Sequence, residues 1–161
     1  MTLILNLLQD AFFAALAAIG FASESTPPLN AFKFCALIAA VGHSTRYLLM
    51  NVLGWHIVLA SFVAAVVIGM LAIFIAPKVK CPPETFAFPS LLPMIPGIYA
   101  YHTVQALVLC VSTNDEAVIS HYSSLLIYNG LICTFVIACM VVGAVVPIFS
   151  FKRLSFSATR S

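Results

Sequence analysis

The stretch from His56 to Ala76, HIVLASFVAAVVIGMLAIFIA, carries no Asp, Glu, Lys or Arg and is followed directly by Pro77. A helix of about 20 consecutive apolar residues is long enough to cross the hydrocarbon part of a bilayer. Because lipid offers no partner for backbone N–H and C=O groups, such a segment must satisfy its backbone hydrogen bonds internally, as a helix does. The stretch therefore predicts a membrane-spanning helix.

The same apolar character extends over the whole chain of 161 residues, of which 63% are hydrophobic and only 7% are charged. A soluble domain has about half apolar and about a quarter charged residues, so lipid is expected to be the solvent for most of this surface. The five cysteines lack the spacing of a metal site, and the sequence has no interleaved basic and aromatic residues of the nucleic-acid-binding kind. We expect no cofactor, metal or nucleic acid partner.

Four further segments have the length and apolarity of membrane spans, and prolines, glycines and polar clusters separate them. The first lacks a preceding Lys or Arg, so we expect a retained helix rather than a cleaved signal peptide. The sequence predicts an all-α, polytopic protein with five transmembrane helices in a single domain over residues 1–151, followed by a short cytoplasmic tail over residues 152–161. The predicted helices cover approximately residues 3–22, 31–51, 56–76, 86–111 and 123–149.

The distribution of basic residues predicts the orientation of these five helices. Six of the seven basic residues fall on one side, and only Arg46 lies near the other. Because Lys and Arg are retained in the cytoplasm, we expect a cytoplasmic C-terminus and an external N-terminus. The six residues on the cytoplasmic side are Lys33, Lys78, Lys80, Lys152, Arg153 and Arg160.

Three ionisable residues stand out inside the predicted spans: Asp10 in the first helix, and His43 and Arg46 in the second. An ionisable group at the bilayer centre costs at least about 2.5–3.5 kcal/mol, so each should face a partner or a cavity. In antiparallel helices Asp10 reaches the depth of His43 and Arg46, so we expect it to pair with one of them. The cluster is one candidate for an electropositive site that binds a carboxylate, with His43 as a proton carrier. The alternatives are a structural ion pair, or an Arg46 side chain that extends to the outer headgroups.

The fourth predicted helix carries the motif Pro93-Met94-Ile95-Pro96-Gly97, which removes two backbone donors and adds a flexible glycine. We expect a break near the middle of the membrane, with a new helix starting near Gly97 whose free N–H groups attract an anion. A plain proline kink is the alternative. Tyr101 and Gln105 follow Gly97 at intervals of four residues, which predicts one polar stripe on the new helix.

Two stretches resemble the small subunit of two-component threonine/serine exporters: residues 35–46, CALIAAVGHSTR, and residues 93–101, PMIPGIYAY. The third connection, Ala76-Pro77-Lys78-Val79, is similar as well. The resemblance implies export of threonine, serine or succinate-like dicarboxylates from the bacterial inner membrane, together with a larger membrane subunit, and leaves room for a higher oligomer. The motif residues present here are His43, Arg46, Pro93, Pro96, Gly97 and Tyr101.

Three functions compete on the sequence alone. The favoured one is a subunit of a gradient-driven secondary exporter for small carboxylates or amino acids, because no nucleotide-binding loop is present. The second is a scaffold that stabilises a partner membrane protein without transporting anything itself. The third, a membrane enzyme, is disfavoured because no nucleophile–base pair or metal cluster can be assembled at a common depth.

Overall fold

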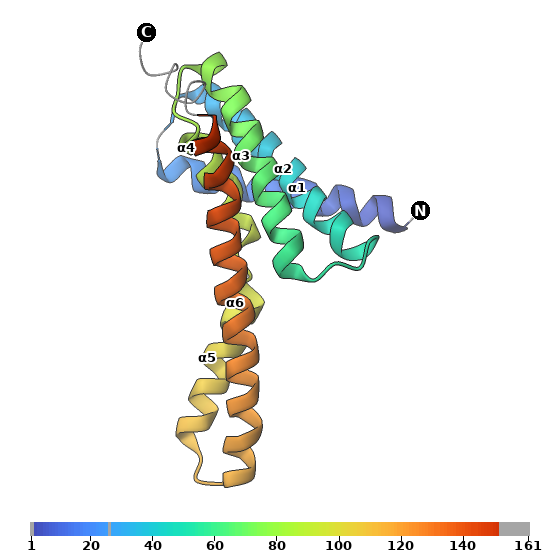
Figure 1. Ribbon diagram of the computed structural model, residues 1–161, viewed down its shortest axis with the longest axis vertical. Helices are drawn as coiled ribbons and strands as arrows, with labels where there is room; N and C mark the ends of the chain where they lie inside the picture. The colour runs from blue at the N-terminus through green and yellow to red at the C-terminus, as the bar shows by residue number, and fades with distance from the viewer. Residues whose placement is uncertain (1, 26, 152–161) are drawn as a thin grey trace. The chain divides into compact units, whose positions relative to one another are not determined.

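Helices make up almost all of the computed structural model, which describes residues 2–25 and 27–151. No strand occurs in these ranges, so the all-α prediction is confirmed for them. The predicted tail, with Lys152, Arg153 and Arg160, lies outside the described residues. The elements are α1 (Thr2–Glu24), α2 (Leu29–Asn51), α3 (Ile57–Val79), α4 (Glu84–Leu91), the 3₁₀ helix η1 (Leu92–Met94), α5 (Gly97–Ser112) and α6 (Glu116–Ser150), as Figure 1 shows.

Three helices of the described part are long and apolar enough to cross a membrane, namely α1, α3 and α6, and a fourth span results if α4 to α5 is counted as one broken span. The remaining long helix, α2, has 23 residues but carries Lys33, His43 and Arg46 along it. These polar side chains lower its average apolarity. Composition and length therefore support three or four spans. The predicted total of five is reached only if α2 also crosses the membrane.

The largest differences between the observed and the predicted helix ends are at the end of α3 and at the start of α6. Helix α3 continues through Pro77 and ends at Val79, and the capping residue Lys80 that follows has a left-handed φ of 56°. A proline so near the end of a helix removes only one hydrogen bond, so the helix is not obliged to stop there. Helix α6 begins at Glu116 rather than near residue 123, because Asp115 Oδ1 accepts the N–H of Ala117 at 2.9 Å and thus caps it.

The described residues form two compact units. The first contains the chain up to Met94 together with α6 from Cys139 onward, and the second contains Ile95–Ala138. In the first unit α1 and α2 lie side by side (Figure 1). Their buried positions are mostly small residues spaced by three or four, which allow helix backbones to approach closely in a membrane. These are Ala14, Ala18 and Ala22 on α1, and Ala31, Cys35, Ala39 and Gly42 on α2.

Helix α3 packs against the C-terminal part of α6 through two glycines. A Cβ added at Gly69 would lie 2.6 Å from the carbonyl oxygen of Ala144, and one at Gly143 would lie 2.7 Å from that of Phe62. Real Cβ atoms do not come this close to backbone atoms, so only glycine permits the two helices to approach so closely.

Helix α4 is fixed on α2 by polar contacts inside the first unit. Ser90 Oγ lies 3.0 Å from the carbonyl oxygen of Cys35 and 2.7 Å from that of Phe86. The Cys35 thiol in turn lies 3.6 Å from the carbonyl oxygen of Thr85. Since Ser90 and Phe86 are fully buried, α4 is anchored firmly, and η1 follows it directly toward the polar half of α2.

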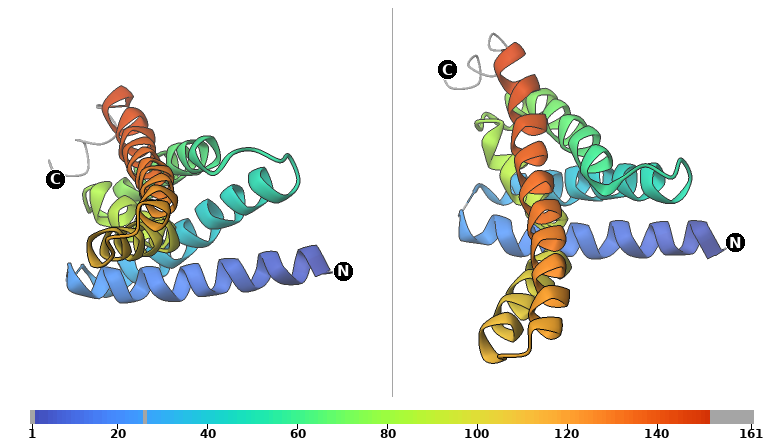
Figure 2. Two further views of the ribbon diagram at one scale, coloured as in Figure 1. Left: turned by 90° about the horizontal axis from the view of Figure 1, so that it is seen from below. Right: turned by 60° about the horizontal axis from the view of Figure 1, so that its bottom comes forward.

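The second unit is a helical hairpin of α5 and the N-terminal part of α6, joined by Thr113–Asp115 (Figure 2). Near its connection, the Cys110 thiol lies 3.7 Å from Ser123 Oγ. Farther along, Gly130 lies opposite Thr103, whose Cγ2 would be 3.5 Å from a Cβ at Gly130. Small side chains therefore lie opposite each other at these two levels of the hairpin.

Candidate functional site

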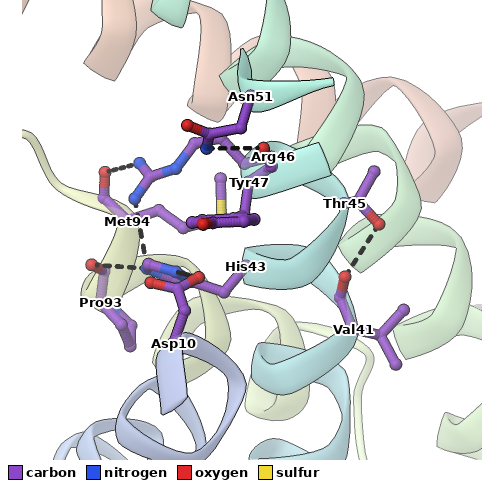
Figure 3. A network of polar contacts seen from close by, with 9 residues as sticks. All are labelled: Asp10, Val41, His43, Thr45, Arg46, Tyr47, Asn51, Pro93 and Met94. Atoms are coloured by element: carbon purple, nitrogen blue, oxygen red, sulfur yellow. Dashed lines mark hydrogen bonds and ion pairs between the residues drawn. The ribbon is translucent and has the colours of Figure 1, made fainter. Parts of the chain in front are cut away.

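Asp10 and His43 form an ion pair or strong hydrogen bond inside the first unit (Figure 3). Asp10 Oδ2 lies 2.7 Å from His43 Nδ1, and the two side chains are 30% and 12% exposed. Because a carboxylate only accepts, Nδ1 carries the hydrogen and donates it. The partner that the sequence predicted for Asp10 is therefore present, and of the two candidates it is His43.

Arg46 lies one turn further along α2 and completes the cluster (Figure 3). Its Nη1 donates to the carbonyl oxygen of Met94 at 2.7 Å, and its Nη2 lies 3.2 Å from His43 Nε2. Within the described residues no carboxylate forms an ion pair with this guanidinium. The strongest cation of the cluster is thus held by neutral acceptors.

The carbonyl groups that His43 and Arg46 contact come from the interruption between α4 and α5. In a continuous helix the oxygen of Pro93 would accept the N–H of Gly97, but that N–H bonds Ile95 at 2.8 Å. His43 Nε2 lies 3.2 Å from the freed Pro93 oxygen, and Arg46 takes the oxygen of Met94. The interruption therefore supplies the acceptors that hold two polar side chains of α2.

The two contacts of His43 Nε2 exclude each other. Arg46 can donate to Nε2 only if that nitrogen carries a lone pair, which makes the ring neutral because Nδ1–H already faces Asp10. Conversely, Nε2 can donate to Pro93 only if the ring is protonated on both nitrogens. The geometry accommodates either state of the ring, and each state has a different partner.

The start of α5 offers fewer free donors than the sequence suggests. The N–H of Gly97 bonds Ile95, and the N–H groups of Tyr99 and Ala100 bond the oxygen of Pro96 at 3.1 and 3.2 Å. Pro96 itself is buried, whereas Gly97 is exposed with no atom within 4 Å of an added Cβ. An anion at this helix start would therefore meet an open glycine but few unpaired N–H groups.

Of the remaining predicted residues, Tyr101 and Gln105 lie in different surroundings. Tyr101 is 63% exposed and its ring contacts that of His102. Gln105 lines a cavity of about 340 Å³ in the second unit, which the sequence did not predict. The lining residues are His102, Gln105 and Ala106 on α5 and Tyr122, Leu125, Tyr128 and Asn129 on α6.

An Asp–His–Arg cluster held among long apolar helices defines an integral membrane protein with a polar centre. The family model of the threonine/serine exporter, ThrE, matches residues 10–149, so the chain belongs to this family of membrane transporters.

The chain is also 36% identical over 143 residues to an uncharacterized protein of Haemophilus influenzae. The matched region is 88% of this chain but 45% of that protein, so the chain spans less than half the length of this relative. No solved structure matches the chain.

Proposed function

We propose that this chain is one subunit of a secondary exporter for small metabolites that carry a carboxylate, and that it works with a larger membrane subunit in a bacterial inner membrane. Amino acids such as threonine and serine, or dicarboxylates such as succinate, are the substrates. In this proposal α2 also crosses the membrane, which brings the number of spans to five. The segment from α4 to α5 is one broken span, and the N-terminus is external. Family membership supports export as the activity.

The observation that carries the substrate site is that, among the described residues, no carboxylate forms an ion pair with Arg46. Its guanidinium donates to the Met94 carbonyl and contacts the His43 ring, while Asp10, whose charge acts on Arg46, is hydrogen-bonded to His43 instead. A substrate carboxylate is a stronger acceptor than a carbonyl and binds a guanidinium with two parallel hydrogen bonds. We infer that the carboxylate replaces Met94 as the partner of Arg46.

His43 couples the charge of the site to pH in this proposal. A histidine side chain changes charge near neutral pH. The protonated ring turns Nε2–H toward Pro93 and no longer accepts from Arg46. One proton thereby frees an Arg46 donor and adds a positive charge, and both changes favour a bound carboxylate.

The proposed larger subunit rests on the resemblance of residues 35–46 and 93–101 to the small subunit of two-component exporters. The matched part of the Haemophilus influenzae protein is less than half of its length. Transport by two membrane halves around a common site is frequent among secondary transporters.

Efflux from vesicles tests the proposal, with this chain alone, the larger subunit alone, and both together. We expect threonine or succinate efflux only with both. Removing a hydrogen bond to a charged group costs about 1.5–3 kcal/mol, so Arg46→Ala should lower efflux per assembled complex about tenfold to a hundredfold. Thr45→Val is the matched control, because the Thr45 hydroxyl donates to the carbonyl oxygen of Val41 on its own helix at 2.8 Å and lies apart from the cluster (Figure 3).

Two outcomes would contradict the proposal. Efflux by this chain alone would exclude the two-subunit arrangement. If Arg46→Ala reduces the amount of complex but leaves efflux per complex unchanged, the chain is the non-transporting scaffold that the sequence left open.

A further inference from the structure

The hairpin of the second unit contains a polar groove that the Asp10–His43–Arg46 cluster does not use. Five of its seven lining residues carry hydrogen-bonding side chains, in a chain that is 63% hydrophobic. Polar groups left without partners in hydrocarbon cost several kcal/mol each. Their gathering on one face of the hairpin indicates that this face contacts something other than lipid.

The helices leave both donors and acceptors available in the groove. Asn129, only 8% exposed, donates its amide N–H to the carbonyl oxygen of Leu125 at 2.8 Å, and no hydrogen bond joins its side-chain carbonyl oxygen to another described residue. Gln105 Oε1 lies 3.3 Å from His102 Nδ1, so its NH₂ group remains for a ligand. Between them Ala106, 3% exposed, provides room because its side chain is a single methyl group.

The chemistry of the lining selects a class of ligand. No Asp, Glu, Lys or Arg lines the groove, so no fixed charge is available to balance a doubly charged anion. Amide, imidazole and phenol groups pair well with a hydroxyl or with the two ends of a zwitterion. A volume of about 340 Å³ is at the lower end of the range of small-molecule sites, about 300–1,000 Å³.

We propose that this groove is a second binding site for the exported molecule and that it prefers a small hydroxylated zwitterion over a dicarboxylate. The proposal rests on the proposed export function and adds a preference that Arg46 cannot supply, because Arg46 recognises any carboxylate. Neutral lining groups bind weakly enough to release the molecule again, which a transport route requires. The outward-facing apolar side chains of α5, such as Val104 and Val108, are 59% and 56% exposed and lie outside the groove.

A cysteine-labelling experiment on the assembled complex tests the groove. Leu125→Cys places a thiol in the lining, and Val108→Cys is the matched control on the hairpin outside the lining. Both are treated with a charged, water-soluble thiol reagent, and labelling is counted above that of the unsubstituted chain, whose five cysteines set the background. We expect at least about fivefold faster labelling at position 125 than at 108. Threonine should slow this labelling, and succinate at the same concentration should not.

Three other labelling results would each contradict one part of the proposal. Labelling at position 125 in the isolated chain but not in the complex would show that the larger subunit fills the groove. Labelling that neither threonine nor succinate slows would exclude a binding site, and equal protection by both would exclude the preference. Asn129→Leu should weaken threonine protection about tenfold if Asn129 binds the ligand.

The same experiment separates this site from the proposed function. In an Arg46→Ala complex, threonine should still protect position 125 although efflux falls. If efflux is normal in Arg46→Ala while protection remains, the groove stands and the role of Arg46 falls. If efflux is reduced in Arg46→Ala and threonine does not protect position 125 even in the parent complex, the groove is not a binding site and the role of Arg46 is supported.

Discussion

Nε2 of His43 lies 3.2 Å from Nη2 of Arg46. Arg46 can donate a hydrogen bond over this distance only when Nε2 carries no hydrogen. The charged groups that face the ring are Asp10 on α1 and Arg46 on α2, and η1 contributes backbone carbonyls. Protonation of His43 would therefore break one specific contact and form another, to Pro93. The contact between Arg46 Nη2 and His43 therefore depends on a single proton.

Substrate binding by the complex should strengthen as the pH of the measurement is lowered from about 8 to about 5, because a histidine side chain can gain a proton. The sign follows because the protonated ring releases Arg46 and adds positive charge beside it. His43→Gln, which cannot gain a proton, should bind with an affinity that varies less than about twofold over this range. The affinity of purified complex for succinate and threonine, measured by calorimetry at several pH values, checks this. An unchanged pH dependence in His43→Gln would assign the proton to another group.

Asp10→Asn should reduce both stability and efflux while preserving side-chain volume. The hydrogen bond from His43 Nδ1 would then end on a neutral acceptor, and charged hydrogen bonds are about twice as strong as neutral ones. We expect a loss of about 1–2 kcal/mol in the free energy of unfolding. Thermal unfolding in detergent measures it, with Thr45→Val as the reference. A complex that unfolds at the parent temperature would mean that the Asp10 contact contributes nothing to stability.

Pro96→Ala should lower efflux by allowing the helix to close across the interruption. The new N–H and the flexibility gained at position 96 favour regular i to i−4 bonds, which would withdraw the Pro93 and Met94 oxygens from His43 and Arg46. Pro147→Ala is the control, since Pro147 already lies inside the continuous helix α6. Efflux per complex and helicity by circular dichroism check the pair. Equal efflux in both variants would separate the interruption from transport.

Gly69→Ala should destabilise the first unit by about 1–3 kcal/mol, the usual result of overpacking. Its Cβ would lie 2.6 Å from the backbone oxygen of Ala144, which cannot move without shifting α6. Gly20→Ala is a matched control on α1, because nothing lies within 4 Å of its added Cβ. That control should gain up to about 1 kcal/mol from helix propensity. Unfolding temperatures that change in the same direction for both would contradict the packing of α3 on α6.

Much of this architecture could be predicted from the sequence because its determinants are local. Apolar length predicts the helices, and depth along antiparallel helices brings Asp10 to His43, as the structure shows. The roles of Met94 and Pro93 could not be read from side chains, since both act through backbone oxygens. Counting which N–H groups the prolines remove would have indicated them.

The polar stripe on α5 shows where local reasoning ends. An interval of four residues places Tyr101 and Gln105 on neighbouring parts of one helix face. Only Gln105 lines the groove, because the packing of α6 decides which part of that face is enclosed. The enclosure depends on Tyr122, Leu125 and Asn129, which are far away in the sequence and whose spacing gives no signal of it.

The length of α6 has a consequence for the membrane itself. Its 35 residues extend about 52 Å at 1.5 Å per residue, whereas the hydrocarbon layer is about 30 Å thick. Its first turns, with Glu116, Ser120 and His121, are polar enough to stand in water. The apolar remainder from Leu125 to Phe149 still exceeds the layer, so it must tilt or stretch the lipid around it. The tilt of α6 should therefore depend on the acyl-chain length of the lipids, and it should be largest in bilayers of short-chain lipids.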